Sequence, residues 1–169
     1  VRQLHDRTKE RRSTSRSLSA EIRTLSMVTG VDPQKRRARL VAIGASTGGP
    51  NALTKLLAPL PDDLAAPVLI IQHMPAEFTK VLVKSLNDRG AIPAVEATHG
   101  MLLEAAQIVV CPGDWHMTVS KDGRYGRVSL NQGAPEHFCR PSVDVLFRSV
   151  AGSIGADALG IVLTGMGKD

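Results

Sequence analysis

Short apolar runs alternate with amphipathic segments along the chain from Leu40 onward. The runs lack polar alternation, which is typical of strands buried on both faces of a parallel sheet. They cover residues 40–45, 67–72, 108–111 and 158–163. Apolar side chains at helical spacing predict helices over residues 50–57, 76–88 and 143–152. This alternation predicts an α/β fold, in which a mostly parallel sheet lies between two layers of helices as a three-layer α/β/α arrangement.

The expected helices have recognisable starts and apolar faces. Pro50 lies early in the first helix, where a helix tolerates proline, and Ser142 is expected to cap the third. The second helix is expected to bury Phe78, Val81, Leu82 and Leu86, and the third Val143, Leu146, Phe147 and Val150. Residues 116–119 and 127–130 flank Lys121-Asp122-Gly123, which predicts a β-hairpin inserted into the fold.

Residues 1–39 differ from the rest of the chain and predict a basic, flexible linker or N-terminal extension. Residues 1–40 hold 11 of the 21 Lys and Arg residues and 4 of the 16 Asp and Glu residues, a net charge of +7, so the remainder carries −2. The basic character therefore belongs to this segment, which argues against a nucleic-acid enzyme. Residues 18–25 have helical spacing, which leaves a partner-docking helix as the alternative.

Three of the expected strands end in polar sequence. These ends are residues 44–50, 72–75 and 164–169. The carboxyl ends of parallel strands meet at one edge of a sheet, where open α/β proteins bind their ligands. We therefore expect Ser46, His73 and Asp169, one from each end, to lie close together.

The first of these ends has the spacing of a nucleophile elbow, Gly44-x-Ser46-x-Gly48, in which a tight turn between strand and helix exposes a serine. Free N–H groups at the start of the following helix can stabilise negative charge. The same residues also suit an anion-binding loop or a plain turn, although the Walker A and dinucleotide-binding patterns are absent. The motif favours a serine hydrolase and leaves these two alternatives open.

A serine hydroxyl needs an adjacent base near pH 7, and His73 is the residue that could supply it. Asp169 could then hold the imidazole in one tautomer and stabilise the imidazolium. Taken alone, a histidine near a strand end is more often structural than catalytic, and Asp169 could equally be a solvated helix cap. The backbone N–H groups of Gly165-Met166-Gly167 could serve an oxyanion hole beside that carboxylate.

The remaining histidines and the two cysteines do not predict a metal site. His5 lies in the N-terminal segment, and His99, His116 and His137 lie in loops or in the hairpin, without ligand spacing. Cys111 and Cys139 form neither a disulfide framework nor a C-x-x-C pair, which favours reduced thiols in a cytoplasmic protein over a catalytic cysteine. No run is apolar and long enough for a membrane span or a secretory signal.

Four ordered segments resemble the chemotaxis protein-glutamate methylesterase family, the catalytic domain of CheB. They are Gly-Ala-Ser-Thr-Gly-Gly-Pro at 44–50, Gln-His-Met-Pro at 72–75, Arg-Pro-Ser-Val-Asp-Val-Leu-Phe at 140–147 and Leu-Thr-Gly-Met-Gly-Lys-Asp at 163–169. The turn at 111–114 adds a further match. The resemblance runs from about residue 40 to residue 169.

The resemblance implies a catalytic triad of Ser46, His73 and Asp169, with Thr47 beside the nucleophile and the Met166 backbone as oxyanion donor. It implies no metal and no organic cofactor. The reactions it implies are hydrolysis of glutamyl methyl esters on the cytoplasmic helices of chemotaxis receptors and deamidation of receptor glutamines, both by acyl transfer to serine and attack of water. A receiver domain of a phosphorelay, N-terminal to this chain, is a further partner that the resemblance allows.

The sequence also departs from the family pattern. Residues 1–39 are too short for a receiver domain, and the family domain continues past the Gly-Met-Gly-x-Asp motif. Because the chain also begins with Val1, we expect a piece of a longer protein, with residues 40–169 forming a methylesterase domain truncated at its C-terminus. His99 stands where the family often has an acidic residue. The alternatives are a serine hydrolase with another ester or amide substrate, a non-catalytic anion-binding module and an inactive fragment.

Overall fold

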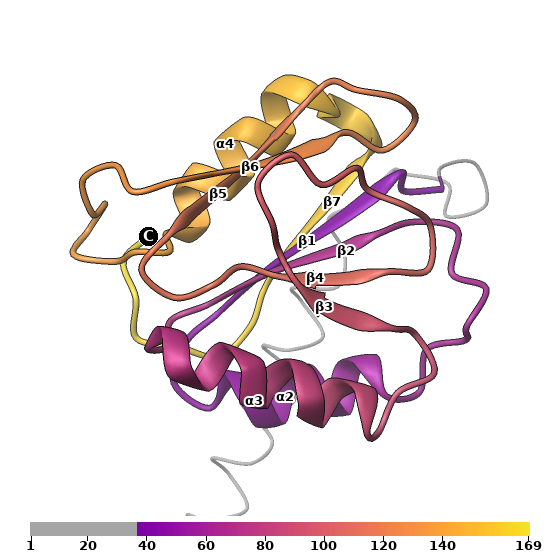
Figure 1. Ribbon diagram of the computed structural model, residues 1–169, viewed down its shortest axis with the longest axis horizontal. Helices are drawn as coiled ribbons and strands as arrows, with labels where there is room; N and C mark the ends of the chain where they lie inside the picture. The colour runs from indigo at the N-terminus through magenta and orange to yellow at the C-terminus, as the bar shows by residue number, and fades with distance from the viewer. Residues whose placement is uncertain (1–36) are drawn as a thin grey trace, which may run out of the picture. The chain divides into compact units, whose positions relative to one another are not determined.

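A five-stranded parallel sheet forms the centre of the computed structural model, which describes residues 37–169 (Figure 1). The strand order is β3-β4-β2-β1-β7. The strands are β1 (Leu40–Ala45), β2 (Val68–Gln72), β3 (Ala94–Glu96), β4 (Ile108–Val110) and β7 (Ala158–Val162). Every neighbouring pair is parallel, so their carboxyl ends share one edge. The predicted docking helix at 18–25 lies outside the described residues.

Two layers cover the sheet, as the sequence predicts. Helices α2 (Gly49–Leu57) and α3 (Ala76–Asn87) lie on one face (Figure 1). The other face carries α4 (Val143–Ser153) and an antiparallel hairpin of β5 (His116–Ser120) and β6 (Arg127–Asn131). A short 3-10 helix, η1 (Gly155–Asp157), leads from α4 into β7. The three-layer α/β/α fold and the inserted hairpin are confirmed.

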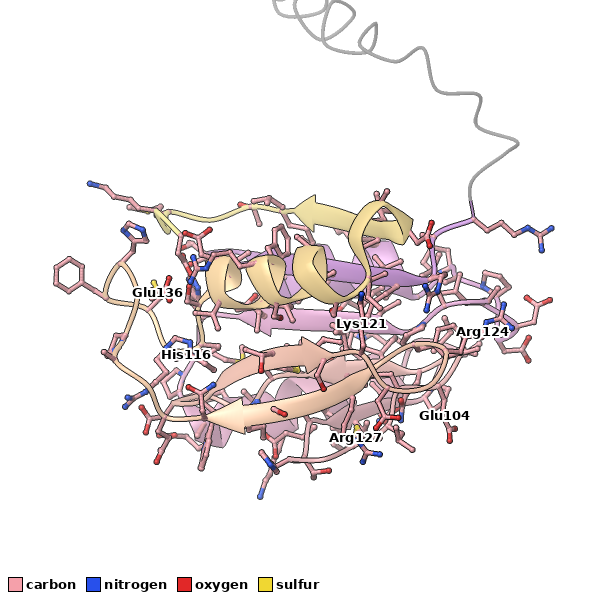
Figure 2. The ribbon with its side chains drawn as sticks, turned by 90° about the horizontal axis from the view of Figure 1, so that it is seen from above. Glu104, His116, Lys121, Arg124, Arg127 and Glu136 are labelled. Carbon is pink, nitrogen blue, oxygen red and sulfur yellow. The ribbon has the colours of Figure 1, made fainter. Side chains whose placement is uncertain are left out.

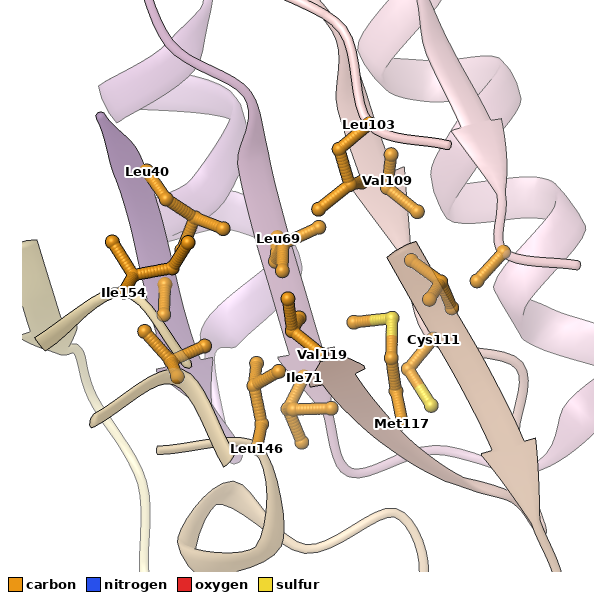
Figure 3. Close-up of a cluster of buried hydrophobic side chains, with 14 of the residues drawn as sticks. Leu40, Leu69, Ile71, Leu103, Val109, Cys111, Met117, Val119, Leu146 and Ile154 are labelled. Atoms are coloured by element: carbon orange, nitrogen blue, oxygen red, sulfur yellow. The ribbon is translucent and has the colours of Figure 1, made fainter. Parts of the chain in front are cut away.

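The core consists of two apolar clusters, one on each face of the sheet. Figure 3 shows the cluster beneath α4 and the hairpin, where Leu146 of α4 and Met117 of β5 meet Leu69 and Ile71 of β2. All four side chains are fully buried. The second cluster packs Leu53 of α2 against the opposite face. The hairpin thus replaces helical cover on one face and completes the core there.

Three details of the fold differ from the sequence prediction. Strand β3 has only three residues, too few for a periodic signal. In α3, Phe78 and Val81 are exposed, and Thr79 takes a buried position because the helix turns that side to the sheet. Strand β7 was expected to be buried on both faces but lies at the edge of the sheet, which leaves its side chains mostly exposed.

The hairpin of β5 and β6 lies alongside α4, and together they form one layer, here called the hairpin layer. This layer has two ends. Figure 2 shows His116 and Glu136 at one end, and Lys121 and Arg124 around the hairpin turn at the other. The chain returns to α4 through residues 132–142, at the end marked by His116 and Glu136. None of the helices between residues 37 and 169 has the length and apolar character of a membrane span.

Candidate active site

Ser46 lies in the tight turn between β1 and α2. Its N–H donates to the Thr164 carbonyl at 3.0 Å, and its own carbonyl accepts from the Gly49 N–H at 2.8 Å. Gly48 closes the turn at φ 78°, a left-handed conformation that favours glycine. Thr47 is exposed, and within residues 37–169 the N–H groups of Thr47 and Gly48 have no acceptor. The turn therefore offers two free donors next to the serine hydroxyl.

Gln72 connects this turn to the end of β2. Its side-chain amide donates to the carbonyls of Ser46 at 2.9 Å and His73 at 3.1 Å. The side chain is 2% exposed, and its oxygen packs so closely on Gly49 that a Cβ there would lie 1.8 Å away. Gln72 fixes the backbone at both residues. The sequence contains a signal for it, since it is the polar end of an otherwise apolar strand.

His73 and Asp169 form a close pair. The distance from His73 Nε2 to Asp169 Oδ2 is 3.1 Å, and the Asp169 side chain is fully buried. The same oxygen accepts the N–H of Val143, the first residue of α4, at 2.8 Å. Ser142 occupies the N-cap position, as predicted, but makes no side-chain capping bond to the helix. The Asp169 carboxylate is therefore a buried acceptor for both the imidazole and α4, and the alternative of a solvated cap does not hold.

The pKa of Asp169 reflects this environment. Burial by itself raises the pKa of the carboxyl group, because it disfavours the charged form. The Val143 N–H, positive charge on His73 and the Ser142 hydroxyl act in the opposite direction and outweigh burial. The net result is a lowered pKa, so Asp169 is ionised at neutral pH, as a residue that orients an imidazole must be.

The segment after β7 closes the pocket through two glycines. A Cβ on Gly165 would lie 2.6 Å from Ser46 Cβ, and one on Gly167 would lie 3.1 Å from His73 Cε1. Ser46, His73 and Asp169 all line the resulting pocket, whose volume is about 80 Å³. Met166, between the two glycines, is 84% exposed and does not line the pocket. No hydrogen bond joins the Ser46 hydroxyl to His73 in the described part of the chain.

Cys139 is a neighbour of His73 that the sequence did not single out. Its sulfur lies 3.8 Å from His73 Nδ1, although the two residues are 66 positions apart. Burial raises the pKa of the thiol, and the negative charge of Asp169 raises it further. Both cysteines are free, with Cys111 buried and Cys139 half-buried. Nothing local in the sequence could have found this contact, because it depends on how residues 132–142 return to the sheet.

The other described histidines have structural partners. His116 is 2% exposed, with Nε2 at 3.1 Å from the Ala134 carbonyl and Nδ1 accepting the Ser142 N–H at 3.2 Å. His99 accepts the Leu130 N–H at 3.2 Å. His137 lies 3.8 Å from Asp144. The structure thus brings His73, and none of these three, to the Ser46 pocket.

A parallel α/β sheet with a serine at a strand-to-helix turn and a His–Asp pair in the same pocket defines a hydrolase-type α/β domain. Residues 41–169 match the family model of the CheB methylesterase, so the chain belongs to the CheB methylesterase family.

Two relatives and one solved structure show how similar this chain is to known proteins of the family. The chain is 46% identical over 140 residues to the protein-glutamate methylesterase/protein-glutamine glutaminase of Maricaulis maris, covering 83% of the chain and 35% of that protein. It is 46% identical over 131 residues to the protein of the same name from Treponema pallidum, covering 78% and 32%. The chain thus spans about a third of the length of these relatives. The crystal structure of the Thermotoga maritima CheB methylesterase catalytic domain superposes with a TM-score of 0.75 at 32% identity, covering 78% of this chain and 70% of that one.

Proposed function

We propose that this chain carries the catalytic residues of a protein-glutamate methylesterase and protein-glutamine glutaminase. Ser46 is the nucleophile, His73 the base and Asp169 the residue that orients the base. The observation that carries the proposal is the pocket shared by Ser46 and His73, in which a buried carboxylate holds one imidazole nitrogen at 3.1 Å. The names of the relatives supply the reaction.

The proposed reaction uses each atom of this geometry. Asp169 accepts the Nε2 proton of His73, so Nδ1 is the nitrogen with a free lone pair. His73 removes the Ser46 proton at Nδ1, and the hydroxyl oxygen attacks the glutamyl ester carbonyl. The N–H groups of Thr47 and Met166 stabilise the oxyanion. Methanol leaves with the proton from His73, and water then releases the free glutamate. A glutamine side chain follows the same course, with ammonia as the leaving group.

The proposed substrates are glutamyl methyl esters and glutamines on the cytoplasmic helices of chemotaxis receptors, which places the protein in the cytoplasm during sensory adaptation. A receiver domain of a phosphorelay, N-terminal to this chain, is the further partner that the family resemblance supports. Neither the proposed nucleophile nor the proposed base requires a metal or an organic cofactor for these steps.

A fluorophosphonate probe tests the nucleophile directly, because it reacts with activated serine hydroxyls. We expect one label per chain, located at Ser46 by peptide mass spectrometry. Ser46→Ala should abolish labelling and methanol release from a methylated receptor fragment. His73→Ala should slow both by a factor on the order of 10⁴–10⁶, as removal of a triad base does. Ser120→Ala, at the exposed end of β5, is the matched control and should react like the unmodified chain.

These measurements, together with assays of small-ester turnover and of phosphate binding, separate the alternatives. Methanol release that persists in Ser46→Ala rejects the assignment. Rapid turnover of small esters with no action on methylated receptor favours a hydrolase of another ester. Binding of inorganic phosphate at the Ser46 turn without probe labelling favours an anion-binding module.

A further inference from the structure

Three potential metal ligands converge at one side of His73. Cys139 Sγ, a His73 ring nitrogen and an Asp169 carboxylate oxygen all lie within 4.8 Å of one another. The residues come from three separate parts of the chain: the segment before α4, the end of β2 and the segment after β7. The proposed reaction requires His73 and Asp169 but gives Cys139 no task, so the thiol needs an explanation of its own.

The distance between sulfur and nitrogen fits a shared metal ion. A tetrahedral Zn²⁺ holds nitrogen at about 2.0–2.1 Å and sulfur at about 2.3 Å, which places the two ligand atoms about 3.6 Å apart. Cys139 Sγ and His73 Nδ1 are 3.8 Å apart. Within the described region these atoms are therefore already close to the separation that a bound ion would impose.

Asp169 pairs with His73 in the way that a carboxylate usually pairs with a metal-binding histidine. A ligating imidazole almost always donates its other N–H to a carboxylate or carbonyl, which fixes the tautomer. His73 Nε2 faces Asp169 Oδ2 at 3.1 Å, and the other ring nitrogen, Nδ1, lies 3.8 Å from Cys139 Sγ. The other carboxylate oxygen, Oδ1, is buried and makes no hydrogen bond within residues 37–169, so the ionised carboxylate lies beside the two ligands.

The segment that carries Cys139 is bound to α4 through Glu136. Glu136 and Cys139 exchange two backbone hydrogen bonds, at 2.8 and 3.1 Å, around a turn with positive φ at His137 and Phe138. Arg148 of α4 binds both carboxylate oxygens of Glu136 at 2.5 Å. Figure 2 shows Glu136 and the buried His116 at this end of the hairpin layer. Cys139 therefore lies at the end of a hydrogen-bonded turn whose first residue pairs with α4.

We propose that Cys139 Sγ and His73 Nδ1 form a binding site for a thiophilic divalent cation such as Zn²⁺, with Asp169 as the outer partner of the imidazole. Binding replaces the thiol proton, which passes to solvent, with a sulfur–metal bond, and Nδ1 donates its lone pair to the ion without any change of oxidation state. Water completes the coordination. The site does not rest on the proposed function, but the ion would occupy the nitrogen that the proposed base uses and so would inhibit that reaction.

The test uses the reduced full chain, purified without a histidine tag. Titration with Co²⁺ should give the near-ultraviolet absorption of a thiolate–cobalt bond, and Zn²⁺ should displace the Co²⁺. Zn²⁺ affinity is then measured by competition with a chromophoric chelator. Cys139→Ser should abolish the absorption and weaken Zn²⁺ by more than about 10-fold, and Asp169→Asn should weaken it by about 10–100-fold, the usual cost of losing an outer partner.

Cys111→Ala is the matched control, because Cys111 is the buried cysteine and lies in the core (Figure 3). It should retain the absorption and the affinity, and circular dichroism should show that all variants are folded. Absence of a thiolate–cobalt band in the unmodified chain would overturn the proposal, and so would an unchanged band in Cys139→Ser. Labelling of Ser46 in metal-free buffer reports on the proposed function separately, and Zn²⁺ should slow it only when Cys139 is present.

Discussion

At the scale of single residues, the pocket depends on positions without a side chain. Gly165 lies with its backbone directly against Ser46, since a Cβ there would approach Ser46 Cβ to 2.6 Å and the Ser46 backbone to 3.3 Å. Gly152, in α4, is different, because a Cβ there would meet nothing within 4 Å. Alanine substitutions at these two glycines therefore separate the effect of crowding Ser46 from the general effect of replacing glycine by alanine.

We expect Gly165→Ala to displace Ser46 or the segment after β7 and to destabilise the fold by about 1–3 kcal/mol, the usual cost of overpacking. Labelling by fluorophosphonate should fall sharply. Gly152→Ala should stabilise the fold by about 0.5–1 kcal/mol, because alanine is the better helix residue. Urea unfolding followed by circular dichroism measures both. Equal labelling rates in the two variants would show that the close approach of Gly165 is unimportant.

The buried carboxylate of Asp169 makes stability depend on pH. Its pKa is lower in the folded chain than the value of about 3.9 for an unfolded Asp. Ionised Asp169 therefore contributes stability that is fully present above about pH 4 and is lost as the pH falls through the folded pKa. Urea midpoints between pH 6 and pH 2 should decline less steeply in Asp169→Asn than in the unmodified chain. Asp62→Asn, at an exposed loop position, should leave the slope unchanged.

At the scale of elements, the end of β2 and the turn between β1 and α2 form one unit through Gln72. Replacement by leucine keeps the bulk but removes the donor, which leaves the His73 carbonyl unpaired and the Ser46 carbonyl with the Gly49 N–H alone. We expect Gln72→Leu to cost about 1–3 kcal/mol of stability, the usual cost of an unpaired buried polar group.

As a positioning residue, Gln72 should also affect the reaction. The labelling rate in Gln72→Leu should fall at a temperature where the variant is still fully folded. Gln132→Leu, at an exposed position, is the control for the substitution type. A normal labelling rate in folded Gln72→Leu would restrict its role to stability.

Periodicity in the sequence predicts most elements here because each carries its own signal. The three helices, four of the five sheet strands and the hairpin follow from local apolar spacing and one Lys-Asp-Gly turn. Burial in α3 could not be predicted in the same way, since the choice between Val81 and Thr79 depends on the neighbouring strand. The meeting of Ser46 and His73 follows from the parallel sheet, because each directly follows a strand. The position of Asp169 also depends on its hydrogen bonds to His73 and to the Val143 N–H. The contact of Cys139 with His73 does not follow from the sheet, because it depends on an irregular segment.

At the scale of the whole molecule, α4 connects the core beneath the hairpin layer to the candidate active site. Leu146 anchors α4 in the core cluster of that face, and the first N–H of the same helix binds the Asp169 carboxylate. Leu146→Ala should therefore cost about 2–5 kcal/mol, as large-to-small changes in a core do. Leu102→Ala, at a position 48% exposed, should cost far less. Urea unfolding compares the two, and similar losses would contradict the assignment of Leu146 to the core.

Because α4 donates a hydrogen bond to Asp169, the imidazole proton of His73 is sensitive to the state of the first turn of α4. The proton on His73 Nε2 rests against a carboxylate whose other partner is the start of a helix. Its NMR frequency should consequently change whenever the first turn of α4 frays, even while the central sheet remains intact. One imidazole signal would thus reveal, in solution, the earliest loosening of a helix that is distant in the chain from the residue being observed.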